Sequence, residues 1–283
     1  MRFYDTTHPY YCGIDLHARL LYVCIIDQLG KVLVHKEISA DPEKLQKLLQ
    51  PYIDRVVVGV ECMHCWYWVS DFCEALSIDF ILGHALYMKA IHGDKAKNDR
   101  IDSHKIAKLM RGGNFPLAYV YPKEMRATRD LLRRRTRIVR HGANLKAHVA
   151  NTTSQYNLPP NSVNLKNVNA REQLRSTFPD SVVQRNIDMD MSILDHYAKE
   201  LSKVEWFIEQ QAKQHNPTHL QLLKTVHGIG RILALTILYE IGNINRFESV
   251  QNFASYSRLV KCKAESAGKS YGTQGNKIGN AHL

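Results

Sequence analysis

The 283-residue sequence lacks any apolar run that approaches the roughly 20 residues of a membrane-spanning helix. Its N-terminal segment, residues 1–11, is polar and lacks the apolar core of a secretory signal peptide. We therefore expect a cytoplasmic protein without a membrane partner, in which the six cysteines are reduced thiols.

A second Cys-x-x-Cys pair is also missing. Cys62 and Cys65 form one such pair, with His64 between them, whereas a structural zinc site would need another pair at suitable spacing. The alternatives are metal or redox use of the pair and burial of both thiols. We expect the thiols to be buried.

Acidic residues are scarce relative to basic ones, since 27 Asp and Glu against 38 Lys and Arg give a formal net charge of +11. This surplus favours a polyanionic partner, although a merely basic protein is the alternative. Hydrophobic residues make up 45% and charged residues 23%, which is ordinary for a folded globular protein. The length suggests two domains with a connecting element.

The first 120 residues alternate between strand-like and helix-like patterns. The expected strands cover residues 11–16, 21–26, 32–38, 55–60 and 78–82. The expected helices begin at Asp41-Pro42, cover residues 65–76, and cover residues 95–110 before Gly112-Gly113. Three strands followed by alternating helices and strands is the order of an α/β, RNase H-like fold.

Beyond residue 122 the chain becomes basic and helical. Residues 123–148 combine an apolar stripe with many cations, which predicts an amphipathic basic helix and a nucleic-acid contact. The cations assigned to this contact are Arg126, Arg129, Arg133, Arg134, Arg137, Arg140 and Lys146. After a polar segment at 157–169, apolar residues recur at alternating four and three spacing from Ile187 to Ile208. That spacing indicates either a coiled-coil arm, pairing with the first helix or another subunit, or an ordinary bundle helix.

Four carboxylates stand at positions where chemistry is plausible: Asp15 on the first strand, Glu61 at the end of the fourth, and Asp99 with Asp102 on the later helix. In the expected fold the first and fourth strands are neighbours, and residues three apart share a helix face. Four such oxygen ligands would suit two divalent cations about 3.5–4 Å apart, with Mg²⁺ the expected ion. Alternatively, Asp102 is a surface charge and Asp99 a helix cap.

Two C-terminal segments suit contact with phosphate. Gly228 and Gly230 form an apolar-x-Gly-Ile-Gly turn, which is typical of a helix-hairpin-helix, or of a plain turn between two helices. Ser266 and Lys269 lie among small residues, so they form either an exposed hydroxyl in a cationic loop or simply a flexible polar loop.

Over nearly its whole length the chain resembles the DEDD transposases of bacterial insertion sequences, which are related to Piv-type DNA invertases. The matching motifs are Gly-Ile-Asp ending at Asp15, Val-Glu ending at Glu61, and Lys-Asn-Asp-Arg-Ile-Asp-Ser at 97–103. The Gly-Ile-Gly block at 228–230 and the Ser-Ala-Gly-Lys block at 266–269 follow in the family's order.

The resemblance implies a RuvC-like RNase H-fold domain at 8–120, a basic helix and coiled-coil connection at 121–216, and a mostly α-helical transposase domain at 217–283. It further implies that Asp15, Glu61, Asp99 and Asp102 are catalytic and bind Mg²⁺, and that Ser266 attacks a DNA phosphate. A structured RNA that guides the choice of DNA, and a homodimer or homotetramer, are the partners that the family leads us to expect.

The sequence departs from the family in two places. Most members have Gly and Pro before the serine, where this chain has Tyr-Ser-Arg-Leu-Val-Lys at 256–261. Members also continue with a further helical segment, so we expect the C-terminal domain that stops at Leu283 to be incomplete. Two alternatives to a transposase therefore stay open: a two-metal nuclease that uses water, and a non-catalytic nucleic-acid-binding remnant.

Overall fold

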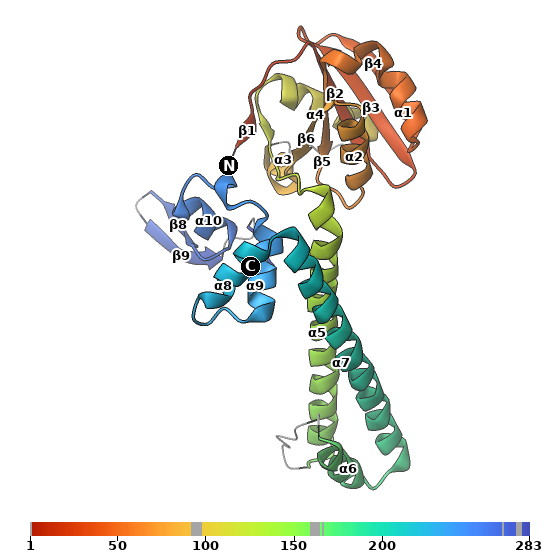
Figure 1. Cartoon of the computed structure of the whole chain (residues 1–283), viewed down its shortest axis with the longest axis vertical. Helices are drawn as coiled ribbons and strands as arrows, with labels where there is room; N and C mark the ends of the chain where they lie inside the picture. Colours follow the sequence, from red (N-terminus) through yellow and green to blue (C-terminus); the bar gives the residue numbers. More distant parts are fainter. Residues whose placement is uncertain (1, 92–97, 159–164, 166, 268, 276–278) are drawn as a thin grey trace. The chain divides into compact units, whose positions relative to one another are not determined.

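The computed structural model describes residues 2–91, 98–158, 165, 167–267, 269–275 and 279–283 (Figure 1). The chain divides into two compact units, Met1–Lys123 and Glu124–Leu283. Within the described residues, none of the helices has the length and apolar character to cross a membrane. The finer division into three domains at residues 120 and 216 stays a prediction.

The first unit is built on a five-stranded mixed sheet. Its strands are β2 (Tyr10–Leu16), β3 (Leu20–Asp27), β4 (Val32–Ser39), β5 (Val56–Glu61) and β6 (Asp79–Gly83), in the order β4-β3-β2-β5-β6. The first three form an antiparallel meander, whereas β5 runs parallel to both β2 and β6. This mixed α/β arrangement is compatible with an RNase H-like domain, and the first and fourth predicted strands are neighbours as expected.

Helices cover both faces of this sheet (Figure 1). On one face, α1 (Pro42–Leu49) and α2 (Tyr67–Ala75) bury Leu45 and Val69 against Ile14 and its neighbours. On the other face, α4 (Asp99–Arg111) buries Ile106 and Met110. Because side chains alternate along a strand, residues of β2 and β5 fall into two sets, and every second residue faces α4.

Short elements that the sequence did not predict complete the unit. They are β1 (Phe3–Tyr4), which pairs with β7 (Phe115–Pro116), the 3-10 helix η1 (Gln50–Arg55) and α3 (Ala85–Ile91). Segments of two to seven residues contain too few positions to display a period, so tertiary contacts decide their conformation.

The second unit contains two long helices, α5 (Lys123–Gln155) and α7 (Ser181–His215), with the shorter α6 (Val168–Ser176) between them in sequence. Leu132 near the start of α5 packs with Ile208 near the end of α7, whereas Val149 packs with Ile187. The two helices are therefore antiparallel (Figure 1). Whether they supercoil as a coiled coil stays a prediction.

The C-terminal part consists of α8 (Pro217–Thr225), α9 (Arg231–Ile241), the 3-10 helix η2 (Ile244–Arg246) and α10 (Val250–Tyr256), followed by β8 (Lys261–Ser266) and β9 (Lys269–Gly275). The two strands form an antiparallel hairpin in the segment for which a polar loop was expected. The predicted loop is therefore wrong for this segment, because pairing between the strands satisfies backbone groups that the polar composition alone assigned to solvent.

Candidate active site

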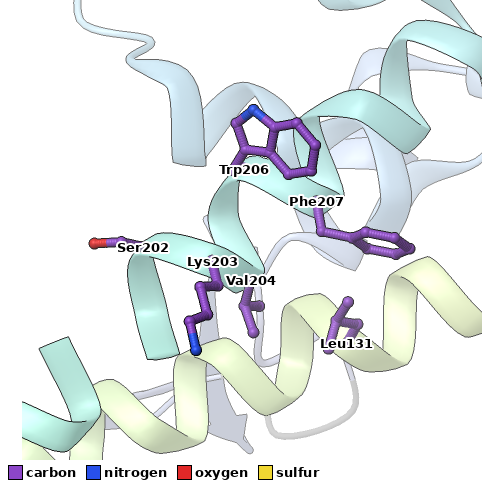
Figure 2. Close-up of a pocket in the computed structure, with 6 residues that line it drawn as sticks. All are labelled: Leu131, Ser202, Lys203, Val204, Trp206 and Phe207. Atoms are coloured by element: carbon purple, nitrogen blue, oxygen red, sulfur yellow. The ribbon is translucent and has the colours of Figure 1, made fainter. Parts of the chain in front are cut away.

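A shallow hollow of about 620 Å³ lies between α5 and α7 (Figure 2). Leu131 of α5 lines it together with five consecutive or near-consecutive residues of α7, among them Trp206, whose surface is 62% exposed. The charged group on its rim is Lys203, which pairs with Glu200 at 2.8 Å. The lining is mostly apolar and contains no acidic residue that could hold a cation, and its hydroxyl, that of Ser202, donates a hydrogen bond to the carbonyl oxygen of Ala198 within the helix.

A chemically richer site lies in the first unit, where β2, β5 and α4 meet. Tyr11, Gly13 and Asp15 alternate along β2 on the side of α4, and the last registered pair of the two parallel strands is Ile14 with Val60. The next residues along these strands are Asp15 and Glu61. Neighbouring residues in register share a sheet face, so both carboxylates belong to the face that α4 covers.

Two glycines allow α4 to approach this face closely. A Cβ atom on Gly13 would lie 2.3 Å from the carbonyl oxygen of Ser103 and 2.5 Å from the amide nitrogen of Ala107. A Cβ atom on Gly59 would lie 2.3 Å from the sulfur of Met110. The glycine of the Gly-Ile-Asp motif is thus required by backbone contact, and it determines how near α4 comes to Asp15.

The N-terminus of α4 carries the other two carboxylates. Asn98 caps the helix, its side-chain oxygen accepting a hydrogen bond from the amide of Arg100 at 3.0 Å. Asp99 is the first helical residue and Asp102 lies in the same first turn. Negative charge is favourable at this end of a helix because the backbone amides point toward it. The cap is therefore Asn98 and not Asp99, which excludes the capping alternative for Asp99.

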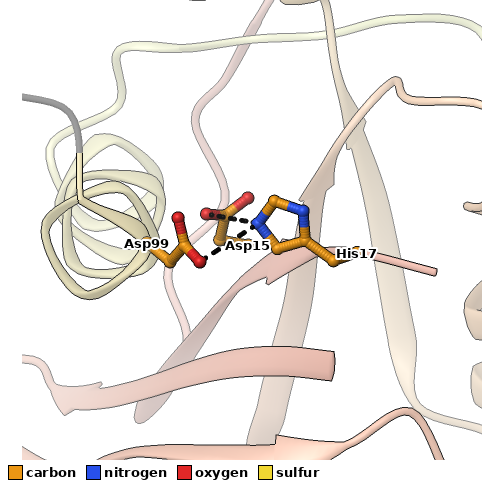
Figure 3. Close-up of side chains that lie close together, drawn as sticks. All are labelled: Asp15, His17 and Asp99. Carbon is orange, nitrogen blue, oxygen red and sulfur yellow. Dashed lines mark ion pairs between the residues drawn. The ribbon is translucent and has the colours of Figure 1, made fainter. Parts of the chain in front are cut away.

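Asp15 and Asp99 converge on the ring of His17 (Figure 3). The His17 Nε2 atom lies 3.4 Å from an Asp15 oxygen and 3.3 Å from an Asp99 oxygen. One ligand atom from each of the three residues lies within 4.8 Å of the other two. His17 lies just beyond the end of β2, and its local sequence does not mark it as a candidate, because its contact with Asp99 joins distant parts of the chain.

Electrostatics make this cluster costly without a cation. Burial raises the pKa of the Asp15 carboxyl; the nearby His17 opposes that effect, and the charges of Asp99 and Asp102 add to it. Asp102 also pairs with Lys105 at 3.6 Å. A carboxylate with a raised pKa beside other acids is stabilised by a divalent cation, so the donor set fits a metal of this kind.

The structure brings together part of the predicted acidic set by direct distances. Asp15 and Asp99 meet at His17, and Asp102 acts on Asp15 through its charge. Glu61 follows the last registered pair of β2 and β5 on the same sheet face and is outside the three-residue group of ligand atoms. Of the matching motif around Asp99, Lys97 lies outside the described residues.

The predicted basic contact surface is divided in the structure. Arg126 and Arg129 are buried, and both Arg129 and Arg133 pair with Glu240, whose side chain is 1% exposed. These three arginines face the interior because they share a helix face with the apolar stripe, at spacings of three and four. The exposed cations of the predicted set are Arg134, Arg137, Arg140 and Lys146.

The C-terminal motif residues lie in two turns. Gly228, with a φ of 85°, and Gly230, the residue before α9, lie between α8 and α9, and a Cβ at either position would meet open space. Ser266 ends β8 and is paired with Lys269, the exposed first residue of β9. Ala267, between them in sequence, has a φ of 51°. The open space around the backbone at Gly228 is suitable for approach by a phosphate.

The Cys-x-x-Cys pair is less buried than expected. Cys62 is exposed, and Cys65 is half-buried with its sulfur 3.6 Å from the carbonyl oxygen of Leu16. The prediction of buried thiols is wrong for Cys62, because the residue comes directly after the end of β5, where the chain leaves the sheet. By contrast Cys12, Cys24 and Cys73 are buried.

Comparison with known proteins agrees with this geometry. A transposase family model of the DEDD type found in IS110 matches residues 12–158, and a second, described as the transposase IS116/IS110/IS902 family, matches residues 220–283. A relative from Pseudomonas aeruginosa, described as a probable family 20 transposase, is 23% identical over 284 residues, which cover 96% of this chain and 80% of the relative. The first match spans Asp15, Glu61, Asp99 and Asp102, and the second spans Ser266. The chain therefore belongs to the IS110-type family of DEDD transposases.

Proposed function

We propose that this chain cuts and rejoins DNA at the ends of an insertion sequence, using an acidic metal site in an RNase H-like domain and Ser266 as nucleophile. The observation that carries the proposal is the convergence of Asp15 and Asp99, from a strand and a helix 84 residues apart in sequence, on one point in a member of a transposase family.

The proposed ligands are Asp15, Glu61, Asp99 and Asp102, and Mg²⁺ is the proposed ion, bound as a pair. When bound, such cations neutralise charge on a phosphate and stabilise the leaving oxygen. The protein's own contribution is to hold the carboxylates in place. The ends of β2 and β5 carry two of them on one sheet face, and the capped first turn of α4 carries the other two.

Ser266 is the proposed nucleophile. Its Oγ would form an ester bond with a backbone phosphorus as one P–O bond of the DNA breaks, and the leaving sugar oxygen would take up the proton that the serine releases. The reverse attack by a hydroxyl of another strand would restore Ser266 and complete strand exchange. The pairing of Ser266 with Lys269 across the end of the hairpin supports this role, because it brings a cation near the proposed nucleophile in the chain's fold.

The proposed partners are DNA, a structured guide RNA and further copies of the chain, as a homodimer or homotetramer. The exposed cations of α5 support contact with a nucleic-acid backbone. The turn at Gly228 and Gly230 supports a helix-hairpin-helix contact with phosphate, since open space surrounds both positions.

The test is a denaturing gel of purified protein incubated with Mg²⁺, RNA transcribed from beside its gene, and end-labelled DNA that spans the element boundary. Wild-type protein should retain label covalently, whereas Ser266→Ala should bind the nucleic acids but form no adduct. Ser270→Ala, a change to another serine of the same hairpin, is the matched control and should form the adduct normally.

The outcomes separate the alternatives. An adduct that persists in Ser266→Ala would refute the nucleophile. Clean cleavage without an adduct, independent of Ser266, would indicate a nuclease that uses water. Binding without strand breakage, in the presence or absence of Mg²⁺, would indicate a non-catalytic nucleic-acid-binding protein.

A further inference from the structure

We propose that His17 is a nitrogen ligand of the cation in the acidic site, through Nε2, and that it shifts the preference of the site from Mg²⁺ toward Mn²⁺. This inference rests on the metal site of the proposed function and adds a residue that the four-carboxylate set does not contain. The residue that would determine which ion binds is thus His17, which follows β2 directly.

The three donor atoms have the spacing of ligands around one cation. With bonds of about 2.1 Å, adjacent ligands of an octahedral ion lie about 3 Å apart and opposite ligands about 4.2 Å apart. The His17 nitrogen lies 3.4 and 3.3 Å from the two carboxylate oxygens, and all three atoms lie within 4.8 Å of one another. Side-chain rotations that shift these atoms by a few tenths of an ångström would bring all three donors to coordination distances from one cation.

Accessibility also favours this role. The His17 side chain is 51% exposed and that of Asp99 is 54% exposed, whereas Asp15 is 19% exposed and fixed by its strand. An ion can therefore enter from solvent on the side of His17 and Asp99, while Asp15 provides the rigid base of the site. His17 follows the last residue of β2, and its backbone amide donates a hydrogen bond to the carbonyl oxygen of Leu20 at 3.0 Å, so the turn after the strand positions the imidazole.

The chemistry of the donor predicts the choice of ion. Mg²⁺ takes almost only oxygen ligands and resists the loss of its waters, whereas imidazole nitrogen suits transition-metal ions. A set of two carboxylates and one imidazole therefore favours Mn²⁺ relative to a set made of carboxylates alone. If His17 were instead only a hydrogen-bonding partner of the two acids, an incoming cation would displace it, and its removal would leave metal binding unchanged or strengthen it.

The experiment measures metal binding by the full chain without nucleic acid. Mn²⁺ and Mg²⁺ affinities are determined by calorimetry, and pulsed electron paramagnetic resonance of bound Mn²⁺ detects coupling to a directly bound ¹⁴N. We expect ¹⁴N coupling in the wild type and its loss in His17→Gln, together with a roughly tenfold weaker Mn²⁺ affinity and a smaller change for Mg²⁺.

Two further variants sharpen the test. His17→Asp replaces nitrogen by oxygen, so it should keep a bound ion, lose the ¹⁴N coupling and favour Mg²⁺ more than the wild type does. His8→Gln alters a histidine that lies 3.7 Å from a different carboxylate, Asp79, and should change neither affinity nor coupling. Thermal melting curves of each variant verify that the fold is retained.

The possible failures differ from one another. Persistent ¹⁴N coupling in His17→Gln, unchanged Mn²⁺ affinity, or equal losses for both ions would overturn the role of His17 and leave the acidic site standing. Undiminished metal binding in Asp15→Asn would overturn the metal site itself, and with it this part of the proposed function.

Discussion

The close approach of α4 to β2 makes Gly13 the most sensitive position in the fold around the acidic site. Gly13→Ala would place a methyl group 2.3 Å from the carbonyl oxygen of Ser103, where an ordinary contact needs about 3.4 Å. Both atoms nearest to the new methyl belong to the backbone of α4, so no side-chain rotation can relieve the clash. We expect the N-terminal half of α4 to move away from the sheet by about 1 Å.

The displacement has two measurable consequences. Overpacking of this kind costs about 1–3 kcal/mol in the free energy of unfolding. It also moves Asp99, at the start of α4, away from Asp15, and a misplacement of about 1 Å in a catalytic array can reduce the rate about 100-fold. We therefore expect the loss of function to exceed what the loss of stability alone would produce.

Urea unfolding, Mn²⁺ calorimetry and DNA cleavage should be measured together on Gly13→Ala. Gly142→Ala is the matched control: the new methyl group would be 3.7 Å from a Leu194 carbon, an ordinary contact, and alanine is the better helix former. The control should be neutral or stabilising. If Gly13→Ala keeps wild-type stability and metal affinity, the reasoning that this glycine positions α4 is wrong.

Three further predictions concern other charged and polar groups. Glu240→Gln should destabilise the second unit by about 3–5 kcal/mol in urea unfolding, because it leaves the arginines around Glu240 without their partner charge. Burial raises the pKa of Glu240, but the hydrogen bond from Arg133 and the charge of Arg129 outweigh it and hold that pKa below its ordinary value. The stabilisation by Glu240 is therefore fully present when the pH is above the pKa of the carboxyl in the unfolded chain, and it is lost as the pH falls through the lower pKa in the folded chain. An equal pH dependence of unfolding in the wild type and in Glu240→Gln would contradict this reasoning. His35→Ala should lower the free energy of unfolding by about 1 kcal/mol and weaken metal binding. The reason is that the His35 Nε2 atom lies 2.8 Å from the carbonyl oxygen of Arg100, in the first turn of α4. His35→Gln should restore part of the stability and part of the metal affinity. Replacing the exposed cations of α5 by alanine should weaken binding of nucleic acids of any sequence, as measured by salt titration; the positions are Arg134, Arg137, Arg140 and Lys146.

The periodicity of apolar residues was sufficient to predict the strands of the central sheet and the long helices of the chain. The strand predicted at 11–16 is β2 (Tyr10–Leu16), and the helix predicted from Asp41-Pro42 is α1, capped by the Asp41 side chain. These elements combine a clear period with a clear start signal. The hairpin β8–β9 has neither, because its strands are polar and rich in small residues, so only pairing between them reveals it.

The candidate site was predicted in part for a similar reason. Asp15 is recognisable in the sequence because a carboxylate interrupts an apolar strand, and the parallel pairing of β2 with β5 puts it on the same sheet face as Glu61. His17 was missed because a histidine just beyond the end of a strand is unremarkable until α4 brings Asp99 to it. That contact joins residues 82 positions apart in sequence, and no local pattern encodes it.

Helical geometry explains why fewer cations of α5 are available to nucleic acid than the sequence predicted. It also gives the length of helix that the exposed cations cover. Arg129 and Arg133 are four residues apart and face Glu240, so their charge is neutralised inside the protein. The exposed cations extend from Arg134 to Lys146, which at 1.5 Å per residue is about 18 Å of helix, or about five steps of one strand of duplex DNA. Long cationic side chains on such a stretch suit contacts with successive phosphates, which position a nucleic acid without reading its bases, so this part of the binding should be independent of sequence.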